Sequence, residues 1–459
     1  MNEKIILHSD LNNFYASVER RLNPELAGVP LAVCGSKEER HGIVLAKSEE
    51  AKRAGVKTGD TIWRAKQKCP GLVTVPPHFD RYIDFSRRVK AIYARYTEYI
   101  ESYGIDECWL DISNFLSVFP RFSGAARADG MCTDEYLRFL GDTIRFAVRD
   151  ELGLTVSVGV SFNKIFAKLG SDLKKPDGTS VISLSNFKNV IYPLPVEDLL
   201  MVGGATSKKL RAMGLTTIGS LAAADDDKII KTFGKFGATL LTYARGRDTS
   251  PVAHVDDERQ LKSIGNSQTY AYDLVYPEQI ERNIYVLSES VAARLRESDR
   301  GKADTVHLWV RYDDLTSFQV QKKVRHTALC SEIAQTAFEL FKANVRRPFA
   351  VRSLGVTVSG FDGQSSQITL DEACGSYSRR EKVERAVDGI RKKHGYASIQ
   401  RGILIDDPAG MYNDVKNSHL IKPARFEDRP EGRVDGDGAE DGGNPFEDDG
   451  DEPFGGGEF

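Results

Sequence analysis

The stretch from Ser102 to Ser113, SYGIDECWLDIS, places two consecutive acids, Asp106 and Glu107, inside an apolar and aromatic run. Side chains alternate between the two faces of a β-strand, and apolar positions alternate on both sides of the acids. The phase of this alternation slips by one residue between Ile105 and Leu110, which indicates a turn or bulge at the acids. The sequence therefore predicts a kink that can bring two neighbouring carboxylates toward one site.

Two like charges that are buried together need a compensating cation. A metal ion is the obvious candidate for Asp106 and Glu107. The alternative is a solvent-exposed hairpin tip on which the acids have no special role. This stretch alone leaves both interpretations open.

The composition predicts a multidomain protein of the cytoplasm. At about 150 residues per domain, 459 residues suggest roughly three domains, and a hydrophobic share of 41% is enough for real cores. We see no run of about 18 apolar residues, so we expect no membrane span. The N-terminal segment has early acids and too short an apolar stretch for a signal peptide. The six cysteines are scattered without a CxxC pair, which is typical of reduced thiols.

The charge is distributed unevenly along the chain. Residues 426–459 contain 13 acidic and two basic side chains, whereas the rest of the chain has 61 bases and 53 acids. A mildly basic body suits a polyanionic partner, but many soluble enzymes have the same balance. We expect the Gly-, Asp- and Glu-rich tail to be disordered from residue 426.

The N-terminal part of the chain has both kinds of periodicity. Residues 4–10 form a predicted strand that ends in Asp10, and residues 82–100 have helical spacing. A predicted strand at 154–161 runs directly into a helix at 162–175, which Pro176 and Gly178 end.

The second part of the chain contains two further units. Residues 183–247 contain a glycine turn between two helical runs, and a polar linker follows at 248–258. Residues 259–404 have the order strand, helix, two strands, helix, strand, which predicts a ferredoxin-like unit. Such a unit is a scaffold and does not reveal a function by itself.

Asp10 adds a third acid to the pair at 106 and 107. Three carboxylates can hold two Mg²⁺ ions about 3.5–4 Å apart, which is the arrangement used for phosphoryl transfer. The predicted ligands are hard oxygens with no His or Cys nearby, which argues against zinc.

Three segments together resemble the signature blocks of the Y-family DNA polymerases, in particular those of the DNA polymerase IV (DinB-type) translesion branch. They are HSDLNNFYASVE, SYGIDECWLDIS and SVGVSFNKIFAKLGSDLKKPDGTSVI. The similarity runs in order over about residues 4–404. It implies an α+β right-hand fold with a ferredoxin-like palm, small fingers, a helix-hairpin-helix thumb, a ferredoxin-like little finger and a disordered acidic tail.

The resemblance also implies domain boundaries. The palm would span residues 1–182, with the fingers inserted at about 14–77. The thumb would span 183–247, the linker 248–258, the little finger 259–407 and the tail 408–459. Small fingers imply an open active site and low fidelity.

The resemblance implies that Asp10, Asp106 and Glu107 are the catalytic metal ligands for two Mg²⁺ ions. The backbone carbonyl of Leu11 would help to hold one ion. The primer 3′-OH would attack the α-phosphate of a dNTP and release pyrophosphate, a reaction that depends mainly on positioning and electrostatics.

The expected dNTP contacts are Phe14, Tyr15, Lys52 and Lys175. Tyr15 matches the steric gate that excludes a ribose 2′-OH, with a core aromatic as the alternative, and we expect Phe14 mainly to pack. Lys52 and Lys175 match basic triphosphate contacts.

Two positions depart from the family pattern near this expected pocket. Glu49 stands where the family has a tyrosine, so we expect Glu49 to point away or to pair with Lys52. Asn12 stands where many relatives have an acid, which we do not expect to abolish activity.

The expected DNA contacts lie in two later regions. Gly203 and Gly204 resemble the thumb hairpin, although Met201 replaces the first glycine, and an ordinary helix-turn-helix is the alternative. The little finger would contribute basic side chains, with a merely solvated face as the alternative. They are Arg311, Lys322, Lys323 and Arg325.

A final expected contact is a sliding clamp. Residues 367–371, with Gln367 and Leu370 as anchors, resemble a degenerate clamp-binding pentapeptide, and an ordinary polar loop is the alternative. Primer–template DNA and dNTPs are the other expected partners, and we expect a monomer without membrane contact. Rival functions are a non-catalytic DNA- or clamp-binding protein and another palm-type phosphoryl transferase such as a nucleotide cyclase.

Overall fold

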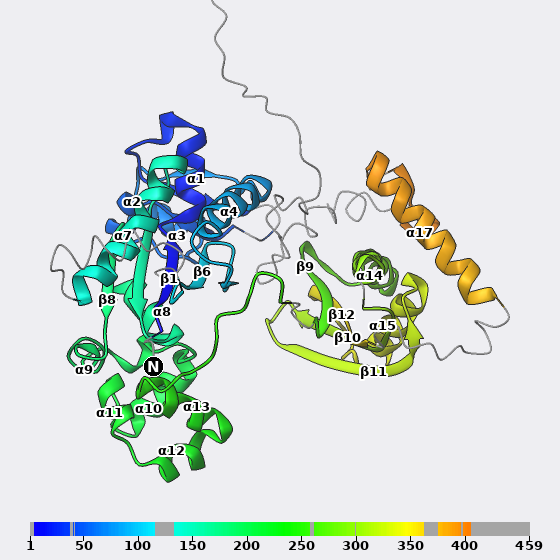
Figure 1. The fold of residues 1–459 in the computed structure, drawn as a ribbon. Coiled ribbons are helices and arrows are strands. Elements are labelled where there is room, and N and C mark those ends of the chain that lie inside the picture. Colours follow the sequence, from blue (N-terminus) through cyan, green and yellow to red (C-terminus); the bar gives the residue numbers. More distant parts are fainter. Residues whose placement is uncertain are drawn as a thin grey trace, which may run out of the picture.

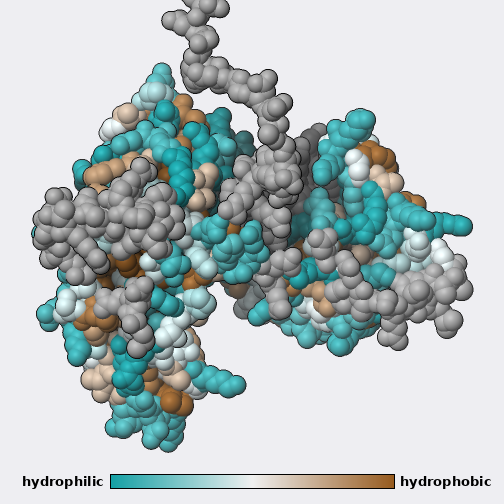
Figure 2. All heavy atoms as spheres, viewed as in Figure 1, coloured by the Kyte–Doolittle hydropathy of each residue, from teal (hydrophilic) through white to brown (hydrophobic). Residues whose placement is uncertain are grey.

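The computed structural model describes residues 4–36, 40, 42–114, 133–257, 261–298, 300–361, 375–395 and 398–404. It has two folded halves joined by an extended segment (Figure 1). The first half contains β1 to β8, and the second contains β9 to β12 with α14, α15 and α17. Among the coloured residues in Figure 2, hydrophilic side chains are frequent on both halves, with smaller apolar patches between them.

The first half is built on a five-stranded sheet in the order β5-β6-β1-β7-β8. Its strands are β1 (Ile6–Leu11), β5 (Ile100–Ser102), β6 (Glu107–Asp111), β7 (Val156–Ser161) and β8 (Thr179–Ile182). β1 is antiparallel to both β6 and β7, and β7 is parallel to β8. All residues of β1 and β7 are buried because helices cover both faces of the sheet.

Helices lie on opposite faces of this sheet. They are α4 (Phe79–Tyr93), α7 (Thr133–Leu152) and α8 (Lys164–Leu173). α4 and α7 pack on the face that carries Leu7, whereas α8 packs on the face that carries Ile6. Gly159 allows α8 to approach β7 closely, since a Cβ there would lie 2.0 Å from the carbonyl oxygen of Ala167. Because side chains alternate along β1, Asp10 lies on the same face as Ile6, under α8.

The helix predicted for residues 82–100 is wrong at its C-terminal end. α4 ends at Tyr93, and Ile100 begins β5, where it pairs with Leu110 of β6. The apolar spacing continues past the helix because Tyr96 packs against the same core. Periodicity alone cannot separate a helix from a following short strand when both bury residues in one core.

A smaller sheet with its own core precedes α4 in the chain. Its order is β3-β2-β4, and α1 connects it to the main sheet. The elements are α1 (Phe14–Leu22), β2 (Leu31–Cys34), β3 (Val44–Lys47), α2 (Glu49–Arg53), α3 (Ile62–Lys68) and β4 (Val73–Val75).

The described chain between β8 and residue 248 forms helices around a second core, which also includes Ile165, Phe166 and Leu169 of α8. The helices are α9 (Phe187–Ile191), α10 (Gly204–Ala212), α11 (Ile218–Ala222), α12 (Asp226–Phe233) and α13 (Lys235–Ala244), with a 3-10 turn at Val196–Asp198. Met201 has φ 73°, a left-handed conformation that favours glycine. The position where the family pattern has a glycine therefore keeps a glycine-like backbone.

The second half has the predicted order of strand, helix, two strands, helix, strand. Its elements are β9 (Ser263–Leu274), α14 (Pro277–Glu297), β10 (Ala303–Tyr312), β11 (Ser317–Thr327), α15 (Cys330–Asn344) and β12 (Val351–Phe361). The antiparallel sheet has the order β11-β10-β12-β9, and its core lies against α14 and α15. α17 (Ser376–His394) is joined to α14 by ion pairs from Arg296 to Glu384 and Asp388.

The segment predicted as a polar linker, residues 248–258, is partly docked on the first half. Val252 is buried in a cluster with Ile6 and Trp109. The backbone N–H of Ala253 donates a hydrogen bond to Glu101, 3.1 Å away. One apolar residue and backbone hydrogen bonds produce this docking. A polar sequence gives no signal for either of them, so the docking could not be predicted.

Two predictions concern residues outside the described part of the chain. One is the clamp-like segment with Gln367 and Leu370, and the other is the acidic tail beyond residue 404. Among the helices that the structure describes, none combines the length and hydrophobicity needed to cross a membrane.

Candidate active site

The three predicted acids converge at one end of β1 and β6. Asp10 and Glu107 are directly paired across the two strands, so their side chains share the face under α8. Asp106 ends the turn between β5 and β6, and its carbonyl accepts a hydrogen bond from the N–H of Leu11 at 3.0 Å. The turn predicted from the slip in alternation is therefore present at residues 103–106.

The electrostatics of Asp106 show that the acids are crowded. Burial raises the pKa of Asp106 to about 6, and the charges of Glu107 and Asp10 add to this shift. A carboxyl group with an elevated pKa is typical of a site that awaits a cation or acts on a proton.

Two lysines lie among these acids. The ammonium group of Lys168, on α8, contacts Glu107 and lies 3.5 Å from Asp10. Lys175 follows α8, and its Nζ lies 2.7 Å from Asp10 and 2.8 Å from Asp172. Burial disfavours both charges, but the neighbouring carboxylates outweigh it and raise the pKa of both lysines. Sequence reasoning identified Lys175 and missed Lys168, whose helical position on the face of α8 toward β1 was the available signal.

The expectation that no His or Cys lies near the acids is wrong. His8 is fully buried on β1, and its Nε2 lies 3.2 Å from Glu107 Oε2. Its Nδ1 lies 2.9 Å from the hydroxyl of Ser171 on α8. Burial alone would raise the pKa of Glu107, but His8 and Lys168 outweigh it and lower that pKa to about 2. The alternation of β1 places His8 on the face of Asp10, two residues away.

The chemistry of the acid cluster fits Mg²⁺, although the side chains are not arranged around an ion. Within the described ranges, no three His, Cys, Asp or Glu side chains are placed so that they could hold a metal. Lys168 and Lys175 lie against the carboxylates instead. The hard oxygen donors and the raised pKa of Asp106 suit a divalent cation, provided that the two ammonium groups move.

Tyr15 lies beside the acids on a rigid aromatic support. Its ring stacks on Tyr82 with a centroid distance of 4.2 Å and contacts Phe79 edge-on. Burial raises the pKa of Tyr15 to about 12, and the charge of Asp106 adds to the shift. Phe14 is buried in the core, in agreement with the packing role expected for it.

The second expected basic contact, Lys52, is paired with the unusual acid Glu49. Lys52 Nζ lies 3.5 Å from Glu49 Oε1, which also accepts a hydrogen bond from Asn13 at 2.9 Å. The pair that we expected is therefore present. Asn12, the other departure, is buried, and its side chain accepts a hydrogen bond from the N–H of Asp177 at 2.8 Å. Asn12 thereby fixes the turn that carries Lys175.

The residues expected to contact DNA lie at the start of α10 and on the second sheet. Gly203 and Gly204 begin α10 with open space where their Cβ atoms would be. Lys323 pairs in register with Thr305, on the face of the second sheet away from α14 and α15. Arg311 lies on that same open face by the alternation of β10.

Lys322 and Arg325 are both paired with acids of α15. Lys322 pairs with Glu339 of α15 at 3.1 Å, and Arg325 lies 3.8 Å from Glu332 of α15. Adjacent residues of a strand face opposite sides, so Lys322 and Lys323 do not present one common surface.

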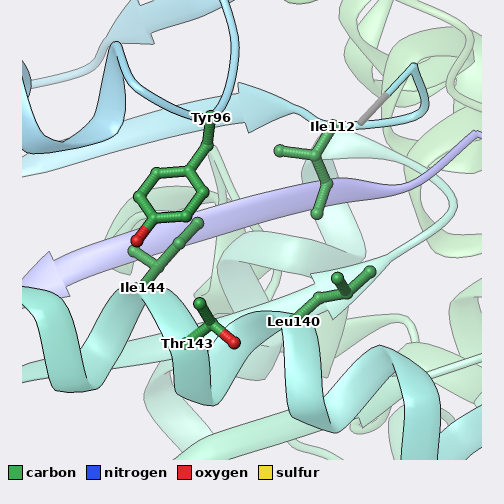
Figure 3. Close-up of a pocket in the computed structure, with 5 residues that line it drawn as sticks. All are labelled: Tyr96, Ile112, Leu140, Thr143 and Ile144. Carbon is green, nitrogen blue, oxygen red and sulfur yellow. The ribbon is translucent and has the colours of Figure 1, made fainter. Parts of the chain in front are cut away.

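An apolar pocket lies away from these acids. It lies beside α7, which contributes Leu140, Thr143 and Ile144 to its lining (Figure 3). Its lining residues are Tyr96, Ile112, Leu140, Thr143 and Ile144. None of these is an acid, so the pocket is not part of the carboxylate cluster.

The raised pKa of Asp106 predicts that this acid destabilises the metal-free fold. The folded pKa of about 6 exceeds the ordinary value of 3.8, so the folded protein binds more protons between these values. Stability therefore falls as pH rises through this window. In chelator at pH 7.5, we expect Asp106→Asn to raise the free energy of unfolding by about 1–3 kcal/mol.

Urea denaturation measures this difference. The gain should shrink as pH falls through the window and vanish below about pH 4, where the wild-type carboxyl is protonated in both states. If Asp106→Asn is as stable as wild type or less stable at pH 7.5, the unfavourable environment inferred for the Asp106 carboxylate is wrong.

Two family models and several known proteins are similar to this chain. The model of the impB/mucB/samB family matches residues 9–172, and the model of that family's C-terminal domain matches residues 261–370. A DNA polymerase IV of Acetivibrio thermocellus is 46% identical over 408 residues, which cover 88% of this chain and 98% of that protein. DNA polymerase IV 1 of Bacillus subtilis is 33% identical over 407 residues, covering 88% and 93%.

Solved structures give the same comparison at the level of the fold. A Y-family DNA polymerase chimera of Dbh and Dpo4 has a TM-score of 0.66 at 25% identity and covers 78% of this chain and 99% of that chain. An insertion ternary complex of Dbh DNA polymerase has a TM-score of 0.55 at 24% identity, with the same coverage.

Proposed function

This chain belongs to the Y-family DNA polymerases of the DinB type, and from that premise we propose an error-prone, two-metal mechanism for its translesion DNA synthesis. The observation that carries the proposal is the convergence of Asp10, Asp106 and Glu107 at one end of β1 and β6, with a raised pKa at Asp106. Phosphoryl transfer needs fixed charge near the reacting oxygens more than it needs a general base.

The three acids and the carbonyl of Leu11 would hold two Mg²⁺ ions. When bound, the ions would supply the positive charge that favours attack by the primer 3′-OH and departure of pyrophosphate. The strand pairing of Asp10 with Glu107 supports this assignment, because it fixes two of the carboxylates relative to each other.

The incoming dNTP would lie between the acids and the basic side chains near them. Lys175, held on its turn by Asn12, would release Asp10 and bind the triphosphate. Lys52 would contribute further positive charge, reduced by its pairing with Glu49. The stacked ring of Tyr15 would lie under the sugar and exclude a ribose 2′-OH, with Phe14 supporting it from the core.

Primer–template DNA would contact two later regions. The N–H groups at the start of α10 around Gly203 and Gly204 can approach a phosphate closely, because neither glycine carries a Cβ. Arg311, on the open face of the second sheet, is better placed for phosphates than Lys322 and Arg325, whose carboxylate partners lie on α15. Lys323 lies on the same open face and would have to leave Asp304, 3.1 Å away, to bind a phosphate.

We assign the domains as follows: palm 1–182, fingers inserted at about 14–77, thumb 183–247, linker 248–258, little finger 259–407 and tail 408–459. In the described residues of this region, the fingers consist of a three-stranded sheet and short helices, which supports an open site with low fidelity. We propose that the enzyme acts in the cytoplasm. We also propose that it is a monomer, and analytical sedimentation can test this oligomeric state.

Primer extension tests the proposal against its rivals. With Mg²⁺ and dNTPs, we expect extension on an undamaged template and past a lesion, with frequent misincorporation. A nucleotide cyclase would instead convert a free nucleoside triphosphate without DNA. A non-catalytic protein would bind primer–template without extending it.

A sliding clamp should stimulate this synthesis through residues 367–371. Leu370 would enter an apolar pocket of the clamp while the Gln367 amide forms hydrogen bonds beside it, and such anchors concentrate binding energy. Tethering to DNA raises the effective concentration without changing the active site. We expect Gln367→Ala with Leu370→Ala to abolish stimulation by the cognate clamp and to leave distributive synthesis unchanged.

The control is a double variant just outside the pentapeptide, Ser365→Ala with Ser366→Ala, which should keep full stimulation. For both double variants, the lengths of the extension products with and without the clamp measure the stimulation. Undiminished stimulation of the Gln367 and Leu370 double variant would move the clamp site elsewhere in the chain.

A further inference from the structure

Lys168 is a partly buried cation among the acids of the candidate site. Its Nζ contacts Glu107, lies 3.5 Å from Asp10 and lies 3.8 Å from Asp172. Only 15% of its side chain is exposed. None of the steps assigned above uses this residue.

The position of Lys168 is built into the fold. α8 is held against β7 at Gly159, and the side chain of Asn163 caps its first turn by accepting a hydrogen bond from Phe166. The hydroxyl of Ser171 lies 2.7 Å from the Lys168 carbonyl and 2.9 Å from His8. The backbone at Lys168 is thus tied to the strand that carries Asp10.

The charge balance of the metal-free site requires such a cation. Three neighbouring carboxylates at one end of β1 and β6 repel one another, and a partner of opposite charge relieves the repulsion. Lys168 reaches two of the acids, Asp10 and Glu107, which are paired across β1 and β6. A cation bound by both acids would have to displace this ammonium group or share the two carboxylates with it.

We propose that Lys168 is a positioning residue that acts as an internal counter-ion, holds Asp10 and Glu107 together without metal and yields to a divalent cation. It stabilises the metal-free enzyme and weakens metal binding, so it sets the Mg²⁺ concentration at which the site fills. This inference rests on the proposed metal site. It also accounts for the absence of a ready metal arrangement in the described part of the chain.

Mg²⁺ binding without DNA or dNTP tests the role independently of activity. By calorimetry, Lys168→Met should bind Mg²⁺ about tenfold more tightly than wild type, because a competing charge is gone. In chelator, the same variant should unfold several degrees lower, because buried carboxylates lose their partner. Saturating Mg²⁺ should remove most of that difference in melting temperature.

Matched variants separate this role from general effects of charge or packing. Lys174→Met removes one charge from an exposed neighbouring position and should change Mg²⁺ affinity less than twofold. Lys168→Arg keeps the charge and should restore the wild-type affinity. Lys168→Gln serves in its place if Lys168→Met does not fold.

The possible outcomes distinguish this proposal from the one it rests on. If Asp106→Ala and wild type bind Mg²⁺ equally, the metal-site assignment fails and the counter-ion role fails with it. If Asp106→Ala weakens binding but Lys168→Met and Lys168→Gln match wild type, only the counter-ion role is overturned. Tighter binding by Lys168→Met, reversed by Lys168→Arg, supports it.

Discussion

We expect Asp106→Ala to lower primer extension by on the order of 10³-fold or more and to change primer–template affinity little. The variant removes one of three carboxylates that converge at the end of β1 and β6, so the proposed site for two divalent ions would lose a ligand. DNA affinity persists because the expected phosphate contacts, such as those of Gly203 and Arg311, lie on other elements. Steady-state extension rates and fluorescence anisotropy measure the two quantities separately.

A matched control is Asp84→Ala. Asp84 is an exposed acid on α4 whose ion pair with Arg88 spans 3.8 Å, and exposed pairs of this kind contribute little. Its extension rate should stay within twofold of wild type. Near wild-type extension by Asp106→Ala would show that the acids at this turn are not the catalytic ligands.

Local patterns in the sequence carry much of this fold. The slip in alternation located the turn before Glu107, and the run from strand to helix at 154–175 located β7 and α8. The order of elements from 263 to 361 also agrees with the prediction. These features follow from the two periodicities of backbone structure, which a short window of sequence contains.

Other features depend on contacts between distant residues, which no local pattern contains. Lys168 meets Asp10 only because α8 folds back over β1, and Val252 is buried only because its segment docks beside Trp109. The face of Lys322 is set by strand register in the second sheet. Position along the chain and charge alone therefore grouped Lys322 with Lys323, whereas the fold separates them.

The largest change in substrate choice is expected at Tyr15. Tyr15→Ala should raise ribonucleotide incorporation relative to dNTP by on the order of 10²-fold, the ratio that corresponds to a clash of about 3 kcal/mol. The ring is well suited to such a clash, because its stack on Tyr82 and its contact with Phe79 prevent it from moving aside. Discrimination of this kind comes from repulsion of the wrong substrate and not from attraction to the right one.

Tyr15→Phe is the matched control, because it keeps the ring and removes only the hydroxyl. The ratio of kcat/KM for each rNTP to that for the matching dNTP should remain near wild type in Tyr15→Phe and rise in Tyr15→Ala. The dNTP rate of Tyr15→Ala should fall less than its discrimination, since the acids beside the ring stay in place. An unchanged ratio in Tyr15→Ala would assign the gate to another residue, whereas a raised ratio in both variants would assign it to the hydroxyl group and not to the ring.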